Sequence, residues 1–233
     1  MESSARRNSK KYRVSNGSYY NFTYNSHQAT NLALDHAGIF LDITVDYYWI
    51  KTTEAVQHKP LFFQHFDGIM FAPGPYQNLF FLNGIIKKIS SLSVPTLITG
   101  ESYRSFIEVL IQLYQLNKLE EKLISDNLIS GNSFEKIEIT PHSSEFIKLY
   151  ENISKIELSS SRYSMYPQLT EELISEIIDV EAYNQFEEAE IVSLKNHDYF
   201  VACGFCPQIS STRELPHPII YTFLRSALIH HEK

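Results

Sequence analysis

Cysteine, tryptophan and methionine are scarce in this sequence: among 233 residues there are two, one and three of them. Two cysteines are too few for a disulfide scaffold, so we expect a reducing, cytoplasmic environment. Long apolar runs are also missing, since no stretch approaches the roughly 18 to 20 residues of a membrane-spanning helix, and we expect no membrane partner. With 43% hydrophobic and 20% charged residues, the composition excludes a disordered chain and predicts a soluble fold.

Basic residues are in short supply outside the N-terminal segment. The net charge is −7, and residues 1–13 hold five basic residues against one acidic residue, which leaves 15 basic and 26 acidic side chains in the remainder. Nucleic-acid binding needs clustered cations, so we expect no nucleic-acid partner. We expect residues 1–12 to form a disordered basic leader and residues 13–233 to form a single domain.

Strand-length apolar runs alternate with longer helical patterns along the chain. The predicted helices cover residues 27–36, 79–89, 103–114, 170–180 and 216–229. The predicted strands cover residues 39–50, 67–72, 94–99, 134–140, 155–158, 190–194 and 199–205, with a hairpin turn at 195–198. We expect Gly38 to end the first helix in a left-handed conformation. The alternation predicts an α/β fold with a mostly parallel central sheet and helices on both of its faces.

Three predicted strands end in unusual sequence. These ends are Pro-Gly-Pro-Tyr at 73–76, Thr-Gly-Glu-Ser-Tyr at 99–103 and Gly-Phe-Cys-Pro-Gln at 204–208. In open α/β sheets ligands bind outside the carboxyl ends of the strands. We therefore place the candidate pocket where these three segments meet.

Several motifs, in one order along residues 11–230, resemble a known family. They are His-Gln-Ala at 27–29, Asp-Gly-Ile with Pro-Gly-Pro-Tyr and Asn within 67–78, Arg-Tyr at 162–163, Tyr-Phe-Val-Ala at 199–202, Pro-Gln at 207–208 and Pro-His-Pro-Ile at 216–219. Together they resemble the class I glutamine amidotransferase domain at the C-terminus of CTP synthase, and still more its stand-alone, C-terminal region-related proteins. The resemblance implies the flavodoxin-like three-layer fold of class I glutamine amidotransferases.

The resemblance also implies where catalytic groups would stand. Active members use a cysteine at the tip of a sharp strand-to-helix turn, a histidine that takes its proton and a glutamate that orients the histidine. The aligned positions here are Gly100 for the cysteine, Cys206 for the histidine and Gln208 for the glutamate. A glycine keeps the strained turn but cannot attack a substrate. The resemblance therefore implies that glutaminase activity is lost.

The same resemblance implies a substrate pocket with altered chemistry. Its expected lining residues are Gly74, Pro75, Tyr76, Glu101, Ser102, Arg162 and Tyr163. Pro75 has no N–H to offer an oxyanion. Ser160 replaces the first arginine of the family's R-x-R-Y segment, whereas Arg162 keeps the second, which is expected to meet the carboxylate of glutamine. The glutamate for the substrate amino group stays open among Glu120, Glu121, Glu135 and Glu145.

Other chemistry-bearing residues have simpler interpretations. Cys203 and Cys206 form a C-x-x-C pair, but residues three apart on a strand point to opposite faces, so we expect a buried Cys203 and neither metal nor cofactor. Ser102 lacks the small residue two places on that a nucleophile elbow needs. For His27 and His217 we favour capping and packing over a functional role.

Two functions follow from these expectations, and a third stays open. In the first, the chain is a glutamine amidotransferase-like protein without glutaminase activity that acts as a binding or regulatory module. In the second, the pocket runs different chemistry on an amino-acid or nucleotide-like molecule. A purely structural role in an assembly is the third. The partners to consider are a small amino-acid-like ligand, another protein, or a second copy in a homodimer.

Overall fold

One sheet runs through the part of the chain that the computed structural model describes, residues 11–16, 25–74, 76, 78–116, 121–130 and 133–232. Its strand order over these residues is β2-β1-β3-β4-β9-β8-β7-β5-β6. The strands are β1 (Lys11–Asn16), β2 (Thr44–Trp49), β3 (Gly68–Phe71), β4 (Thr96–Thr99), β5 (Glu135–Pro141), β6 (Ile156–Ser159), β7 (Ile178–Asn184), β8 (Ala189–Leu194) and β9 (Phe200–Cys203). The helices are α1 (Asn25–Phe40), α2 (Thr52–Ala55), α3 (Pro60–Phe63), α4 (Leu79–Ile89), α5 (Ser102–Tyr114), α6 (Ser144–Leu149), α7 (Pro167–Glu176), α8 (Pro207–Ser210) and α9 (Pro218–His231).

The sheet has a parallel part and an antiparallel part. The five strands β2, β1, β3, β4 and β9 pair in parallel. Beyond β9 the pairs β9–β8, β8–β7, β7–β5 and β5–β6 are antiparallel. The predicted parallel core is confirmed, and the sheet is mixed because the last strands return as hairpins.

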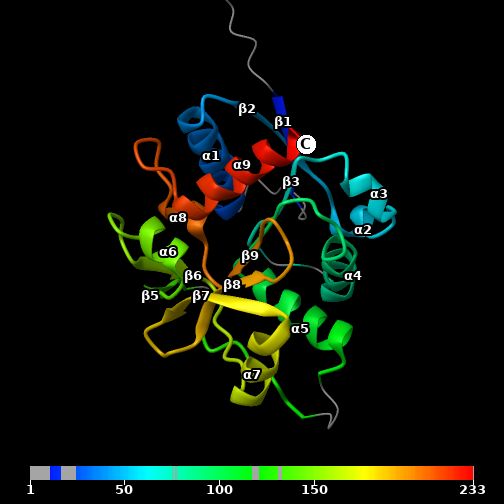
Figure 1. The fold of residues 1–233 in the computed structure, drawn as a ribbon, viewed down its shortest axis with the longest axis vertical. Helices are drawn as coiled ribbons and strands as arrows, with labels where there is room; N and C mark the ends of the chain where they lie inside the picture. Colours follow the sequence, from blue (N-terminus) through cyan, green and yellow to red (C-terminus); the bar gives the residue numbers. More distant parts are fainter. Residues whose placement is uncertain are drawn as a thin grey trace, which may run out of the picture.

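Helices cover both faces of the parallel part (Figure 1). On β3, Ile69 and Phe71 pack in the apolar cluster that also contains the inward residues of α4 and α5. The residue between them, Met70, packs in the cluster formed with α1 and α9. Because neighbouring side chains of a strand point to opposite faces, a strand buried on both sides is expected to be apolar nearly throughout. Ile69 to Phe71 of β3 follow this pattern. In β4 the central Leu97 and Ile98 do so as well, and the buried Thr96 and Thr99 at its ends donate their hydroxyls to backbone carbonyls.

The predicted end of the first helix and the predicted start of the strand after it are both wrong, for one local reason. Helix α1 continues through Gly38 to Phe40, and Asp42 rather than Gly38 takes the left-handed conformation, with a φ of 56°. A Cβ on Gly38 would lie 3.0 Å from Cγ2 of Val45, so the glycine serves the close approach of β2 to α1. The strand predicted for residues 39–50 therefore begins only at Thr44.

The helix predicted for residues 170–180 is shifted as well. Helix α7 starts at Pro167, since proline suits the first turn of a helix, and it ends at Glu176. Residues 178–180 belong instead to β7, whose alternating burial marks a strand with one face on the core. Most of the basic leader predicted for residues 1–12 lies outside the described residues, except that Lys11 and Tyr12 are the first two residues of β1.

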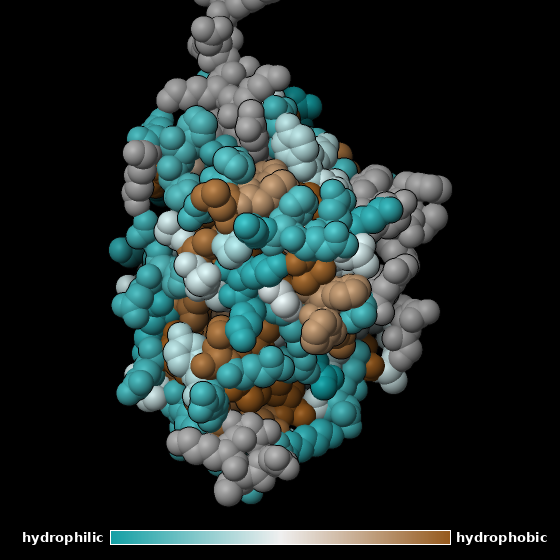
Figure 2. Space-filling view, turned by 90° about the vertical axis from the view of Figure 1, so that its right-hand side faces the viewer, coloured by the Kyte–Doolittle hydropathy of each residue, from teal (hydrophilic) through white to brown (hydrophobic). Residues whose placement is uncertain are grey.

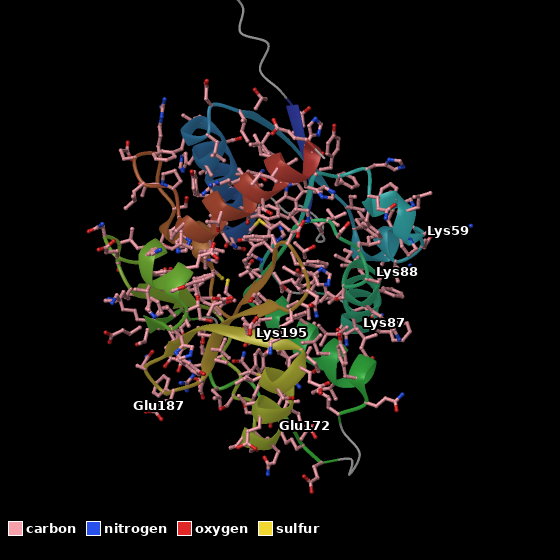
Figure 3. The ribbon with its side chains drawn as sticks, in the orientation of Figure 1. Lys59, Lys87, Lys88, Glu172, Glu187 and Lys195 are labelled. Carbon is pink, nitrogen blue, oxygen red and sulfur yellow. The ribbon has the colours of Figure 1, made fainter. Side chains whose placement is uncertain are left out.

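The surface over α2, α3 and α4 mixes hydrophobic and hydrophilic residues (Figure 2). Leu61 and Phe80 are the most exposed large hydrophobic side chains there. Figure 3 shows Lys59, Lys87 and Lys88 on this same side, with Glu172, Glu187 and Lys195 on the β7–β8 and α7 side of the molecule. The ammonium group of Lys88 donates to the carbonyls of Val56 and His58, which fastens α4 to the segment after α2.

Among the described residues, no helix combines the length and apolar character required to cross a bilayer.

Candidate functional site

The turn between β4 and α5 is sharp, and Gly100 stands at its tip. Gly100 has a φ of 62°, a conformation that costs other residues about 1 to 2 kcal/mol. Its N–H lies 3.0 Å from the carbonyl oxygens of both Cys203 and Phe205, so the turn is fixed to the end of β9. A Cβ built on Gly100 would lie 2.7 Å from Cβ of Pro73, closer than carbon atoms pack. Backbone conformation and available space therefore both require glycine at this position.

Cys206 lies directly beside this turn. The same Cβ on Gly100 would be 3.4 Å from Sγ of Cys206, so a side chain at position 100 would touch the thiol. Strand β9 ends at Cys203, and Cys206 is the N-cap of α8, so the alternation expected for a strand does not reach it. The structure thus brings together Gly100 and Cys206, the residues at the positions expected for a nucleophile and its base.

The Cys206 thiol is not poised to ionise. Its residue is only 1% exposed. Burial, and secondarily the nearby Glu101 carboxylate, raises the pKa of Cys206, although hydrogen bonding with Ser160 opposes this. A thiol is a nucleophile as its thiolate, so Cys206 is expected to be inert at neutral pH.

Gln208 follows in α8 and is also buried, at 2% exposure. Neither its amide nitrogen nor its amide oxygen has a hydrogen-bond partner among the described residues. Unlike a carboxylate, an amide carries no charge that could stabilise an imidazolium. Gln208 is therefore a buried polar group without the chemistry of a triad glutamate.

Glu101, the residue after the elbow, reaches the loop that follows β3. Its Oε2 accepts a hydrogen bond of 3.0 Å from the N–H of Gly74, and its Oε1 accepts one of 2.6 Å from the hydroxyl of Ser160. Gly74 has a φ of 154°, and a Cβ there would lie 2.7 Å from Nε2 of His27. Two other chain segments, the loop after β3 and the segment after β6, therefore donate hydrogen bonds to the Glu101 carboxylate.

His27, for which the sequence favoured capping and packing, lies beside Gly74 in the structure. Its side chain is buried, its ring lies 4.7 Å from the ring of Trp49, and it hydrogen-bonds the backbone of Pro73. Burial lowers the pKa of His27, more than the Pro73 backbone and the Glu101 carboxylate raise it. The sequence signal for its position beside Gly74 is the His-Gln-Ala motif that carries the family resemblance.

The predicted residues Tyr76 and Ser102 lie at the same end of the sheet. The Tyr76 hydroxyl donates to the carbonyl of Ala72 at 2.6 Å, and burial raises the pKa of Tyr76. Ser102 is fully buried and donates its hydroxyl to the Thr99 carbonyl at 2.7 Å, so it is not an accessible nucleophile. Pro75 lies outside the described residues.

Arg162 faces carboxylates of this chain. Its Nε lies 3.6 Å from Glu135 and its Nη1 3.7 Å from Glu188, and the guanidinium lies 4.0 Å from the ring centroid of Phe186. Its positive charge therefore faces two carboxylates of this chain, while its buried Nε and Nη1 have no hydrogen-bond partner among the described residues. Tyr163 stands under the guanidinium of Arg104 and lines a cavity of about 330 Å³.

Within the described ranges, no three His, Cys, Asp or Glu side chains come together in a way that would hold a metal ion. Cys203 is fully buried in the apolar cluster beneath α1 and α9, as predicted, and Cys203 and Cys206 are both free thiols.

Several known proteins are similar to this chain in structure or in part of the sequence. The glutaminase domain of Trypanosoma brucei CTPS, solved with bound acivicin, matches with a TM-score of 0.77 at 15% identity over 94% of each chain. A glutamine amidotransferase from Thermotoga maritima matches with a TM-score of 0.55 at 11% identity, over 95% of this chain and 99% of the other. The CTP synthase of Helicobacter pylori is 33% identical over 81 residues, which are 35% of this chain. No protein family profile matches the chain.

The sequence match spans only 15% of the length of that CTP synthase. The structural matches extend over nearly the whole chain. Because their sequence identities are only 15% and 11%, they show a similarity of fold. Both the predicted resemblance and the predicted fold class are thereby confirmed. The chain has the α/β fold of the class I glutamine amidotransferases and is related to the glutaminase domain of CTP synthase.

Proposed function

We propose that this chain is a glutamine amidotransferase-like protein without glutaminase activity, which acts as a binding or regulatory module. One observation carries the proposal: the residue at the tip of the β4–α5 turn is a glycine whose surroundings admit no side chain. Hydrolysis through a covalent glutamyl-enzyme needs a nucleophile at that tip. Without a nucleophile, the chain can keep the backbone of the pocket and still have no glutaminase activity.

The neighbouring residues support the same conclusion. Cys206 stands where a general base is expected, but a buried thiol with a raised pKa is protonated at neutral pH and accepts no proton from a substrate or nucleophile. The Glu101 carboxylate accepts the Gly74 N–H, a donor of the kind that would otherwise stabilise an oxyanion. On this proposal the turn has no nucleophile, the expected base is a protonated thiol, and one oxyanion donor is already hydrogen-bonded to Glu101.

A glutaminase assay tests the proposal directly. Purified protein is incubated with L-glutamine, and glutamate release is measured beside the matched variants Cys206→Ser and Cys203→Ser. We expect no release above the buffer background for any of the three proteins. Release that is lost only in Cys206→Ser would make Cys206 a nucleophile, and release that survives both substitutions would require another one; either result would overturn the proposal.

A second candidate function is different chemistry on an amino-acid or nucleotide-like molecule in the same pocket. The observation that favours it is the group of polar side chains around Gly74: the imidazole of His27, the carboxylate of Glu101 and the hydroxyl of Ser160. Thermal-shift measurements with glutamine, glutamate and nucleotides separate the two candidates. A ligand at 100 times its Kd stabilises a protein by about 2.7 kcal/mol, so a flat response to all three would leave the protein-interaction role.

We also propose where the protein acts and which kinds of partner it has. We infer a cytoplasmic protein whose partner is a small amino-acid-like ligand, another protein or a second copy of the chain, with neither nucleic acid nor membrane involved. The few cysteines and the acidic remainder of the sequence support this inference. The mass in solution at several concentrations would reveal a homodimer.

A further inference from the structure

The side chain of Glu101 leaves its own helix. Glu101 is the N-cap of α5, yet its side chain accepts no capping hydrogen bond from that helix. A carboxylate at a helix N-terminus ordinarily bonds the free N–H groups of the first turn. Here it bonds two donors from other segments, the N–H of Gly74 after β3 and the hydroxyl of Ser160 after β6. Capping therefore does not explain where this carboxylate lies.

The two donors form a small anion cradle, which we define as the Gly74 N–H and the Ser160 hydroxyl. Each donor meets a different oxygen of the same carboxylate, at 3.0 and 2.6 Å. Hydrogen bonds from two donors to the two oxygens of one carboxylate are both strong and selective for that geometry. Any small carboxylate that replaced Glu101 would find the same two donors in place.

The charge of Glu101 is held by hydrogen bonds. Among the described residues Glu101 forms no ion pair. Its charge adds to the effect of burial, which raises the pKa values of Tyr76 and Cys206, and it opposes the larger effect of burial, which lowers the pKa of His27. The site is thus organised around one negative charge supplied by the protein itself.

We propose that Glu101 is a built-in ligand: it occupies a carboxylate-binding cradle made by Gly74 and Ser160 and so keeps external carboxylates out of the pocket. An internal carboxylate wins this competition because its effective concentration exceeds that of a dissolved competitor. Removal of the side chain should open the cradle to small monocarboxylates. The inference rests on the proposed function in placing a pocket at Gly74 and Gly100, but its readout is stability and not turnover, so the two can fail separately.

The test is chemical rescue of Glu101→Ala by formate. In chloride buffer the variant should melt about 3 to 6 °C below the wild type, because hydrogen bonds to a charged group are lost. Replacing chloride by about 0.2 M formate at equal ionic strength should return at least half of that loss. Wild type and Glu108→Ala, a matched variant of a half-buried glutamate on the same helix, should show only the small common effect of the salt.

Two further measurements make the test specific to the cradle. The double variant Glu101→Ala with Ser160→Ala should lose the formate response, because one donor is gone. In an amide NMR spectrum of Glu101→Ala, formate should shift the Gly74 resonance in a saturable way. If Glu101→Ala is unfolded in chloride, the proposal predicts that formate restores its fold.

Three outcomes would overturn the proposal. The first is an equal formate response in wild type, Glu108→Ala and Glu101→Ala, which would mark a general salt effect. The second is a rescue that survives the loss of Ser160 and leaves Gly74 unmoved. The third is a Glu101→Ala variant that folds with wild-type stability in both salts.

Discussion

The backbone conformation at position 100 and the space around it together allow only glycine. Its φ of 62° disfavours a Cβ, and the Pro73 side chain fills the space where that atom would be. The positive φ alone does not exclude other residues, because many nucleophile elbows hold a cysteine or serine in this strained conformation when the surrounding structure supports it. The lack of space is a property of this chain, because it comes from the position of Pro73 in the loop after β3. Restoring a cysteine at position 100 would therefore need a change in that loop as well.

Gly100→Ala should accordingly be costly for so small a change. We expect a loss of about 2 to 4 kcal/mol in the free energy of unfolding, from the left-handed backbone and the overpacking against Pro73. The matched variant is Gly84→Ala inside α4, where a Cβ would lie 3.3 Å from Cγ2 of Val56 and the backbone is helical. There the gain in helix propensity offsets the tight contact, and the change should stay within about 1 kcal/mol. Urea unfolding compares the two, and equal losses would contradict the account of the turn.

At this scale the sequence predicted some contacts and missed others. The meeting of Gly100 and Cys206 was predictable, because parallel strands β4 and β9 end at one edge of the sheet. The placement of Arg162 was not, because its partners Glu135 and Glu188 lie far from it in sequence, on or near the ends of other strands. Pairing between distant charges depends on the tertiary fold, which no local pattern encodes.

At the scale of elements, β6, α8 and α9 are connected by a polar cluster around the buried carboxylate of Glu157. The Glu157 carboxylate on β6 accepts from the Ser210 hydroxyl of α8 and from Nε2 of His217 at the start of α9, each at 2.9 Å. Nδ1 of His217 accepts the N–H of Ile219, so the proton of the neutral ring lies on Nε2. Because α8 directly follows Cys206, this cluster also fixes the segment that borders the Gly100 turn.

Glu157→Ala should destabilise the protein strongly. The substitution leaves the buried Nε2–H of His217 without an acceptor and a cavity where the carboxylate was, and we expect a loss of about 2 to 3 kcal/mol in the free energy of unfolding. The comparison is His231→Ala, which removes the partner of Asp67 from a half-exposed pair of 2.8 Å. Exposed pairs contribute about 0 to 1 kcal/mol, so the second loss should be small. Thermal melting of both variants checks the difference, and comparable losses would show that the buried cluster contributes little.

Element prediction succeeded where burial and periodicity agree. The α4 helix has both an apolar stripe and an Asn78 cap that accepts the N–H of Phe80, and it was predicted with its observed bounds. The first helix was cut short because Gly38 resembles a cap in sequence. Only the packing of β2 against α1 shows that the glycine makes room for Val45.

For the molecule as a whole, stability should depend on pH through Glu190. Burial raises the pKa of Glu190 to about 7, with Asn184 and Arg162 opposing the shift and Glu188 and Glu135 adding to it. Since the folded-state pKa lies above the unfolded value, the folded protein holds the proton between about pH 4.5 and pH 7 while the unfolded chain loses it. Stability therefore falls as the pH rises through this window and stays lower above it.

Glu190→Gln should remove this fall. At pH 8 the variant should be more stable than wild type by about 3 kcal/mol, and the difference should shrink toward zero near pH 4.5. Glu138→Gln changes an exposed glutamate and should keep the wild-type pH profile. Urea unfolding at four values between pH 5 and pH 8 gives the comparison. Parallel profiles for wild type and Glu190→Gln would show that this carboxyl titrates normally.

The central claim, that no nucleophile stands at the β4–α5 turn, is tested most directly by a chloromethyl ketone analogue of glutamine. A thiolate in the pocket would displace chloride and form a stable C–S bond, which intact-mass spectrometry detects. We predict an unchanged mass for the native protein under conditions in which an active glutaminase domain is fully labelled. A mass increase of one reagent molecule less HCl, mapped to the peptide that contains Cys206, would contradict the claim.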